Sequence, residues 1–180
     1  MYWSVTVANC SVQAMAHSGH DGSAPLYGHV KLNGNAVWQS AWANASIPNR
    51  RGVNVLLVNP FSCALLEPPR QFDTYVGKDA ASQLSTFLQE LIHGVILVVV
   101  TANEAVRCLQ QALSNLSSMG VDVSDVQPGG AFAFVAQKDF PQKTALRKTT
   151  TIELAASVKT DISVTVTGAS RFLIYLVFFS

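Results

Sequence analysis

The chain has 180 residues, a length typical of one domain that buries most of its surface in a single core. Hydrophobic residues make up 49% of it and charged residues 13%, a composition that excludes a disordered chain. Twelve basic against eleven acidic residues give a formal charge of +1, and no basic cluster exceeds Arg50-Arg51, so we expect no nucleic-acid binding.

The first fifty residues predict an antiparallel, β-rich front to the domain. Apolar side chains alternate over residues 3–9, which predicts a half-buried edge strand. Residues 17–26 are rich in Ser, Gly, His and Asp and predict a loop, and residues 28–32 predict a second strand that ends at the Asn33-Gly34 turn. Two tryptophans four positions apart within residues 37–48 would lie on one side if this segment turned helically, although Asn44 and Pro48 limit the length of such a turn.

The middle of the chain alternates between strands and helices. Residues 53–58, 95–100 and 131–137 are short apolar runs, typical of strands covered on both faces. Between them, residues 79–92 carry the apolar stripe of an amphipathic helix, and residues 103–119 predict a second helix. This order predicts parallel neighbouring strands joined by right-handed crossovers.

The last forty residues predict a β-rich rear. Residues 143–148 are basic and have no periodic pattern, which predicts an unstructured segment. Residues 152–158 and 162–167 alternate as two strands, expected to form a hairpin. Residues 172–179 are apolar but too few to span a bilayer, so we expect no membrane span. The fold class is therefore α/β, a mixed β-sheet sandwich with two main helices and antiparallel strands at the front and rear.

Three cysteines, Cys10, Cys63 and Cys108, allow at most one intramolecular disulfide and have no metal-ligand spacing. Cys10 with Cys63 is one pairing left open, and Cys108 is expected as a buried free thiol on the inner side of its helix. Three sequons, at Asn9, Asn44 and Asn115, are candidate glycosylation sites. The first residues lack the basic start and apolar segment of a secretory signal.

Catalytic and metal-binding motifs are weak. His17, His20 and Asp21 offer ligand types for zinc, but in a glycine-rich loop without cysteine we expect them to be solvated, so we predict no metal and no cofactor. No nucleophile elbow, phosphate-binding P-loop or dinucleotide-binding glycine motif occurs.

Several motifs, in order, resemble the GG domain. They are Arg51-Gly52-Val53-Asn54-Val55, the run Arg70-x-Phe72-Asp73-Thr74-Tyr75, Ala102-Asn103-Glu104-Ala105 after a strand, a helix end at residues 116–120, and an aromatic strand at residues 132–140. That domain occurs in interleukin-like epithelial-mesenchymal transition inducers, pancreatic-derived factor, the stem of the O-mannose N-acetylglucosaminyltransferase and cell-surface hyaluronidases. The resemblance covers roughly residues 3–158, which implies a GG-type domain over residues 1–158 and a C-terminal extension over residues 159–180.

The resemblance also implies a ligand site. The transferase stem is a lectin for β-linked N-acetylglucosamine, and its sugar-holding positions correspond to Arg51, Asn103 and Gly129, with Phe132 in place of the family's tryptophan. Asn103 lacks the charge of the family's aspartate, and Gly129 has no side chain to donate. In the same family, Phe72 and Tyr75 would pack into the core, while Asp73 would bond local backbone amides.

The sequence thus predicts a noncatalytic recognition module, outside the cell or in the secretory lumen, that binds a glycan or a cell-surface or extracellular protein. A secreted cytokine-like signalling protein is one alternative. The other is an unrecognised hydrolase or transferase, with a crevice near Asn103, Asp73 and the histidine loop.

Overall fold

The computed structural model describes residues 10–18, 28–41, 50–149 and 158–166. The elements of this part of the chain are, in order, β1 (Cys10–Ser18), β2 (Gly28–Leu32), β3 (Asn35–Ser40), β4 (Gly52–Val58), β5 (Arg70–Phe72), α1 (Lys78–Gln89), β6 (Ile96–Ala102), the 3₁₀ helix η1 (Leu109–Ala112), α2 (Leu113–Ser118), β7 (Ala131–Gln137), β8 (Phe140–Thr149) and β9 (Val158–Val166).

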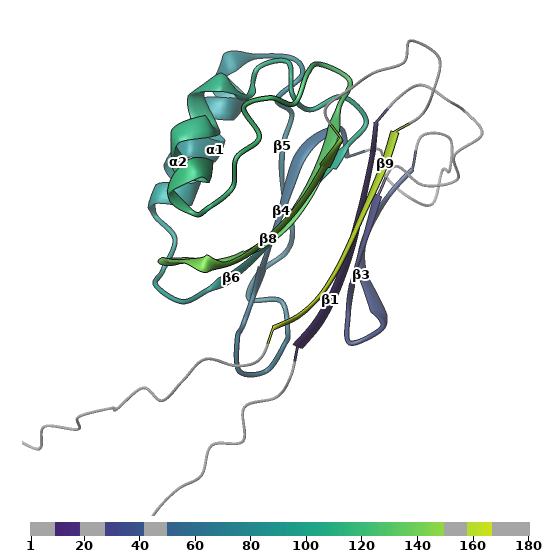
Figure 1. Cartoon of the computed structure of the whole chain (residues 1–180), viewed down its shortest axis with the longest axis vertical. Coiled ribbons are helices and arrows are strands. Elements are labelled where there is room, and N and C mark those ends of the chain that lie inside the picture. Colours follow the sequence, from purple (N-terminus) through teal and green to yellow (C-terminus); the bar gives the residue numbers. More distant parts are fainter. Residues whose placement is uncertain (1–9, 19–27, 42–49, 150–157, 167–180) are drawn as a thin grey trace, which may run out of the picture.

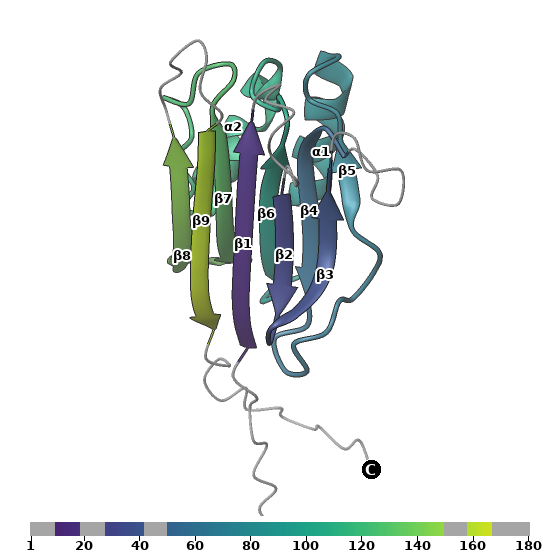
Figure 2. The ribbon, with the colours of Figure 1, turned by 90° about the vertical axis from the view of Figure 1, so that its right-hand side faces the viewer.

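The elements form three layers, seen edge-on in Figure 1. The first sheet has the order β5-β4-β6-β7-β8 and is antiparallel throughout. The second sheet, β3-β2-β1-β9, is also antiparallel and meets the first through a single parallel pair, His17 with Ala102. Helices cover the outer face of the first sheet, and the second sheet covers its inner face (Figures 1 and 2). The predicted α/β sandwich with two helices is confirmed.

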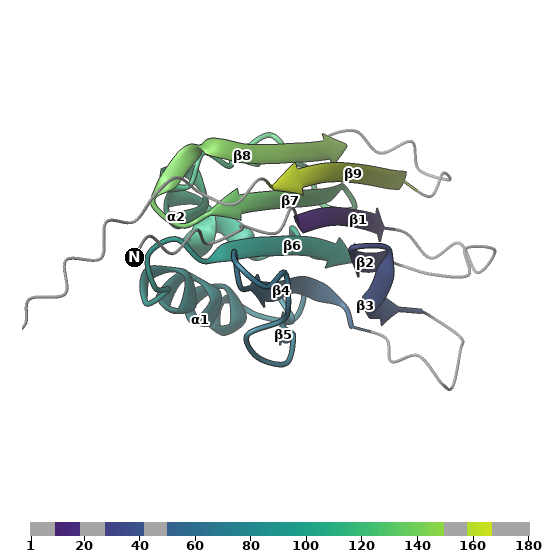
Figure 3. The same cartoon turned by 90° about the horizontal axis from the view of Figure 1, so that it is seen from below.

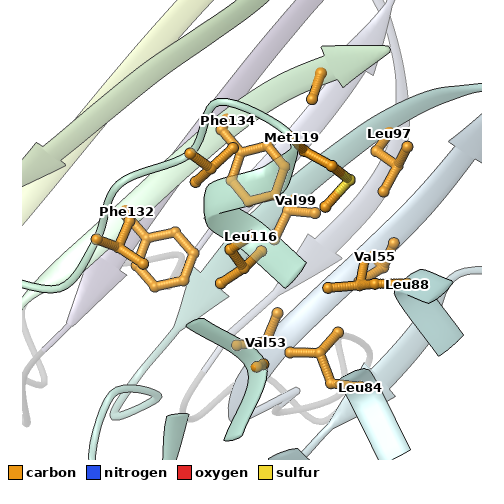
Figure 4. Close-up of a cluster of buried hydrophobic side chains, with 14 of the residues drawn as sticks. Val53, Val55, Leu84, Leu88, Leu97, Val99, Leu116, Met119, Phe132 and Phe134 are labelled. Carbon is orange, nitrogen blue, oxygen red and sulfur yellow. The ribbon is translucent and has the colours of Figure 1, made fainter. Parts of the chain in front are cut away.

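The first sheet is apolar on both faces because its strands alternate between two cores. On β6, Leu97 and Val99 pack against the helices, whereas Ile96, Val98 and Val100 pack against the second sheet. Figure 4 shows the helix-side cluster, in which side chains of α1 and α2 meet those of β4, β6 and β7. Seen from below, α1 lies toward β4 and β5, and α2 toward β7 and β8 (Figure 3).

The prediction that the central strands are parallel is wrong. Residues 53–58 and 95–100 are indeed neighbours, but β4 and β6 run antiparallel, with Gly52 opposite Ala102 and Val58 opposite Ile96. The reason is β5, which pairs antiparallel with β4 and carries the chain back to the end where β4 began. The helix α1 then returns the chain to the other end, so β6 starts beside the end of β4.

The segment of residues 37–48 is not helical where the structure describes it. Residues 35–40 form β3, which pairs with β2 through the predicted Asn33-Gly34 turn. Trp38 is buried and faces the core between the two sheets. A strand explains this burial as well as a helix does, because one buried tryptophan cannot distinguish the repeat of a helix from that of a strand. Trp42 lies outside the described residues.

The second predicted helix is shorter than expected. Residues 103–108 are irregular, and only η1 and α2 are helical. Asn103 takes a left-handed conformation, with φ of 58°, which prevents a helix from starting there. The first helix is confirmed as α1, Lys78–Gln89, but it ends before the predicted residue 92. Ile92, which was predicted on its apolar stripe, lies beyond the helix and is exposed.

The rear of the domain differs from the prediction. Residues 143–148 belong to β8, which pairs with β7, because the apolar strand supplies backbone partners that the local pattern does not show. No turn occurs at residues 159–161, since β9 is continuous there and pairs with β1 along its length. The expected domain boundary at residue 158 therefore falls at the start of a sheet strand. Residues 3–9, 152–157 and 172–179 lie outside the described residues.

One disulfide joins the two sheets. Cys10, at the start of β1, bonds Cys63, in the loop after β4, with 5.2 Å between their Cα atoms. Cys108 is a free thiol and is half-buried rather than fully buried as predicted.

Candidate functional site

The candidate ligand residues come from one end of the first sheet. Gly52 begins β4 opposite Ala102, the last residue of β6. The buried hydroxyl of Thr101 bonds both the N–H and the carbonyl of Phe132, at 3.0 and 3.1 Å, which fixes the start of β7 beside the end of β6. Arg51, Asn103 and the turn before β7 are therefore neighbours along one rim of the sheet.

Arg51 and Asp73 form the central ion pair of this rim. The guanidinium donates from Nε to Oδ1 at 3.1 Å and from Nη2 to Oδ2 at 2.8 Å, a two-pronged geometry. Hydrogen bonding to Asp73 raises the pKa of Arg51, so the cation is retained across the whole physiological range. About a third of each side chain is exposed, so the pair is accessible to a ligand.

Tyr75 is an aromatic platform between two cations. The guanidinium carbon of Arg51 lies 4.5 Å from the centre of the Tyr75 ring, and that of Arg107 lies 5.3 Å from it. Both distances are within the range of cation–π attraction. Tyr75 is half-buried, so the prediction that it packs fully into the core is corrected. We call Arg51, Asp73, Tyr75 and Arg107 the arginine rim.

The loop of residues 73–75 is held by the segment that follows β6. The hydroxyl of Thr74 donates to the carbonyl of Ala105, and the N–H of Cys108 donates to the carbonyl of Thr74 at 3.0 Å. Buried Phe72 anchors the other side of the loop in the helix-side core. These contacts place Asp73 and Tyr75 next to Arg107, which is distant in sequence.

Gly52 allows Arg51 to reach this loop. Its φ is 101°, a conformation that side chains rarely adopt, and a Cβ atom there would overlap the carbonyl oxygen of Phe72. The backbone of β4 therefore approaches the end of β5 closely. As a result, Asp73 binds Arg51 and not the local backbone amides that the sequence predicted.

The other predicted ligand residues do not reach the surface. Asn103 is buried, and Phe132 is fully buried and stacked on Phe134 with 6.3 Å between ring centres. Both belong to the same rim by strand register, but neither presents a side chain to a ligand. Gly129 lies in the turn before β7 with φ of 85°.

Sequence reasoning missed Arg107 as a member of the rim. An exposed arginine in an irregular segment has no periodic or motif signal, and only the bonds between Thr74 and residues 105–108 bring it to Tyr75. Tyr75 itself was assigned a packing role because its motif carries no sign of exposure.

One of the three predicted glycosylation sites can be described. Asn115 lies in α2, and its Nδ2 donates to Ser85 of α1, to the carbonyl at 3.1 Å and to the hydroxyl at 2.6 Å. A glycan attached to Nδ2 would replace one of these two donated hydrogens. Asn9 and Asn44 lie outside the described residues.

Metal-binding clusters and membrane-spanning helices are both absent from the described residues. Within residues 10–18, 28–41, 50–149 and 158–166, no three His, Cys, Asp or Glu side chains are grouped as a metal site would require. The helices of these segments are all too short or too polar to cross a bilayer.

Comparison with known proteins gives the family. A family model described as ILEI, interleukin-like EMT inducer, matches residues 51–140. The chain belongs to the interleukin-like EMT inducer family. This is a GG-domain family, so the resemblance indicated by the ordered motifs is confirmed. The segment shared with the family begins at Arg51 and contains the whole arginine rim. A search among curated proteins finds no match.

Proposed function

We propose that this member of the interleukin-like EMT inducer family is a noncatalytic extracellular recognition module that binds a glycan of the N-acetylglucosamine type at the arginine rim. One observation carries the proposal: two guanidinium groups lie over the half-buried ring of Tyr75 at the end of the sheet, and one of them is paired with the carboxylate of Asp73. The family is a cytokine-like, noncatalytic one, which favours binding over a hydrolase or transferase.

The chemistry of the arginine rim suits a sugar. Charged donors and acceptors bond hydroxyl and acetamido groups more strongly than neutral ones do. The ring of Tyr75 attracts both guanidinium groups by cation–π interaction and so helps to orient their N–H donors toward a ligand. Asp73 and Arg51 already hold each other in place, so the ligand does not have to order them on binding.

An extracellular location fits the disulfide. Cys10–Cys63 links the two sheets, and structural disulfides persist in oxidising compartments. The family's description as interleukin-like points the same way.

That description also favours a second candidate, a secreted signal that acts through a protein receptor on cells. In this case the arginine rim would contact receptor carboxylates, since Arg107 takes part in none of the ion pairs formed within the described residues.

A glycan array tests the proposal. The secreted full-length chain should bind arrayed N-acetylglucosamine-terminated glycans, and Arg51→Ala should weaken binding at least tenfold, as expected when charge-assisted hydrogen bonds are lost. Arg70→Ala is the matched control, because Arg70 also pairs with a carboxylate and lies 4.7 Å from a ring centre, that of Phe87, at another place.

The second candidate predicts a different result. A receptor-binding signal would bind cells stripped of glycans, lose that binding on Arg107→Ala, and show no selectivity on the array. Selective array binding that is unchanged in Arg51→Ala would refute the arginine rim as the sugar site.

A further inference from the structure

A second surface lies at the opposite end of the first sheet. Two adjoining cavities of about 360 and 170 Å³ share Leu66 and Ile92 in their walls. They open where β4 and β7 end and β6 begins. The seven residues of β4 separate this end from the arginine rim by about 20 Å. We call this surface the distal groove.

The distal groove gathers exposed apolar side chains. In the described part of the chain, four large hydrophobic residues are exposed, and three of them, Phe61, Leu66 and Ile92, line it. Ile92 is 67% exposed. A concentration of this kind on one small area is typical of an interaction site, whereas isolated exposed hydrophobics are ordinary.

The loop that carries Phe61 is held in one conformation. The Oδ1 of Asn59 accepts the N–H groups of Phe61 and Ser62, at 2.8 and 3.1 Å. The N–H of Cys63 bonds the carbonyl of Asn59 at 3.0 Å, and the disulfide ties Cys63 to β1. The exposed ring is therefore presented on a fixed loop, which lowers the entropy lost when a partner binds.

A residue in the wall of the smaller cavity carries a buried acceptor that has less than 1 Å² exposed to solvent. Gln137, the last residue of β7, lines this cavity and is only 4% exposed. Its Nε2 donates to the carbonyl of Gly94 at 3.0 Å, but its Oε1 has no hydrogen-bond partner among the described residues. A buried carbonyl oxygen without a partner is unfavourable, so the cavity favours a ligand that brings an N–H or O–H donor.

The charges around the larger cavity are acidic on balance. Glu67 is paired with Arg70 at 2.8 Å. Glu90 lines the same cavity and forms no close ion pair among the described residues. The hydrogen bond to Glu67 raises the pKa of Arg70, and the nearby charge of Glu90 adds to that effect. Two carboxylates thus share one cation, so a cation on a partner would be attracted to this place.

We propose that the distal groove binds a tyrosine side chain of a protein partner, followed in the partner by a lysine or arginine. The ring lies between Phe61, Leu66 and Ile92, and the cation pairs with Glu90. The side chain of Gln137 turns so that its Oε1, which is shut off from solvent in the free protein, accepts the O–H of the phenol. The 170 Å³ cavity is smaller than the sites that enclose whole small molecules but suits one side chain. Tyrosine carries its donor at the tip of the side chain, as a buried acceptor requires, and aromatic anchors of this kind dominate protein interfaces.

Titration of the full chain with three N-acetylated tripeptide amides, followed by NMR, tests the proposal. The peptide Ser-Tyr-Lys should shift the side-chain amide of Gln137 and the methyl groups of Leu66 and Ile92. Ser-Phe-Lys, which lacks only the hydroxyl, should bind about fivefold more weakly. Ser-Tyr-Glu should bind about threefold more weakly, because an exposed ion pair contributes little.

Two variants and a matched control sharpen the test. Ile92→Ser should weaken binding of Ser-Tyr-Lys about tenfold through lost apolar contact. Val76→Ser is the control, because Val76 is 70% exposed but lines neither cavity, and it should bind as the wild type does. Glu90→Lys should reverse the preference between the Lys and Glu peptides.

Equal binding of the tyrosine and phenylalanine peptides would overturn the proposal, as would shifts confined to other parts of the chain or the absence of any shift. Arg51→Ala should leave peptide binding unchanged, so a failure of the arginine rim as a sugar site and a failure of the distal groove would be distinguished.

Discussion

Arg51 and Asp73 are twenty-two positions apart in the sequence, and their side chains meet in a two-pronged ion pair whose shorter bond, from Nη2 to Oδ2, is 2.8 Å. The pair exists because Gly52 brings the start of β4 against the end of β5. It fixes the one predicted ligand residue that reaches the surface, and the first two predictions concern it.

Asp73→Ala should weaken glycan binding more than it destabilises the fold. Each partner is about a third exposed, so the ion pair contributes only about 1 kcal/mol to the free energy of unfolding. Urea denaturation of Arg51→Ala, Asp73→Ala and the double variant should give a coupling energy of that size. The Arg70–Glu67 pair is the control, because it is also at the surface. A coupling energy close to zero for both pairs would contradict a structural role for the contact between Arg51 and Asp73.

Gly52→Ala should destabilise the protein by more than about 2 kcal/mol, because both the positive φ and the overlap with Phe72 oppose a side chain there. Gly34→Ala separates the two effects. Gly34 has φ of 83° but open space around its Cα, so this variant should lose only about 1 kcal/mol. Chemical denaturation measures the free energy of unfolding of both variants. Equal losses would show that the close approach of Gly52 to Phe72 does not contribute to the effect.

Phe132→Ala should lower the free energy of unfolding by about 3–5 kcal/mol, since its ring is fully buried between the sheet and the helices. Phe61→Ala removes an equal number of atoms from an exposed ring and should change stability by less than about 0.5 kcal/mol. The comparison requires only thermal or urea unfolding. A mild effect at Phe132 would restore it as a candidate ligand residue.

Replacing both Cys10 and Cys63 by serine should destabilise the protein by about 4 kcal/mol, because the bond closes a segment of 53 residues in the unfolded chain. Cys108→Ser should change stability by less than about 1 kcal/mol, since that thiol is free and half-buried. Unfolding curves with and without reductant would test both statements: reductant should reproduce the double substitution in the wild type and have no effect on the double variant.

The sequence allowed the apolar strands and the first helix to be predicted, because their periods are local and strong. Strand direction could not be predicted in the same way. It depends on β5, three residues long, whose pairing with β4 has no local signature. Two other segments show the same limit. Residues 35–40 form a strand because they pair with β2, although the tryptophan spacing also suits a helix. Residues 158–166 form one continuous strand because they pair with β1, although their sequence suggests a turn.

For the candidate site, the family motifs gave residues that share one rim of the sheet but did not show which of their side chains are accessible. They placed Arg51, Asn103 and Phe132 at one end, yet burial removes the last two from contact with a ligand. Arg107 joins the arginine rim only through tertiary hydrogen bonds. A motif records which residues share a strand end and not which side chains are solvent-accessible.

The first sheet is shielded on one face by helices and on the other by a second sheet, so the ends of its central strands are open to external molecules at the two rims. Molecules bound at both rims would be aligned along the strand axis, with a spacing set by the length of β4. The distance between two molecules bound in this way would be fixed by the number of residues in a strand and not by a flexible linker.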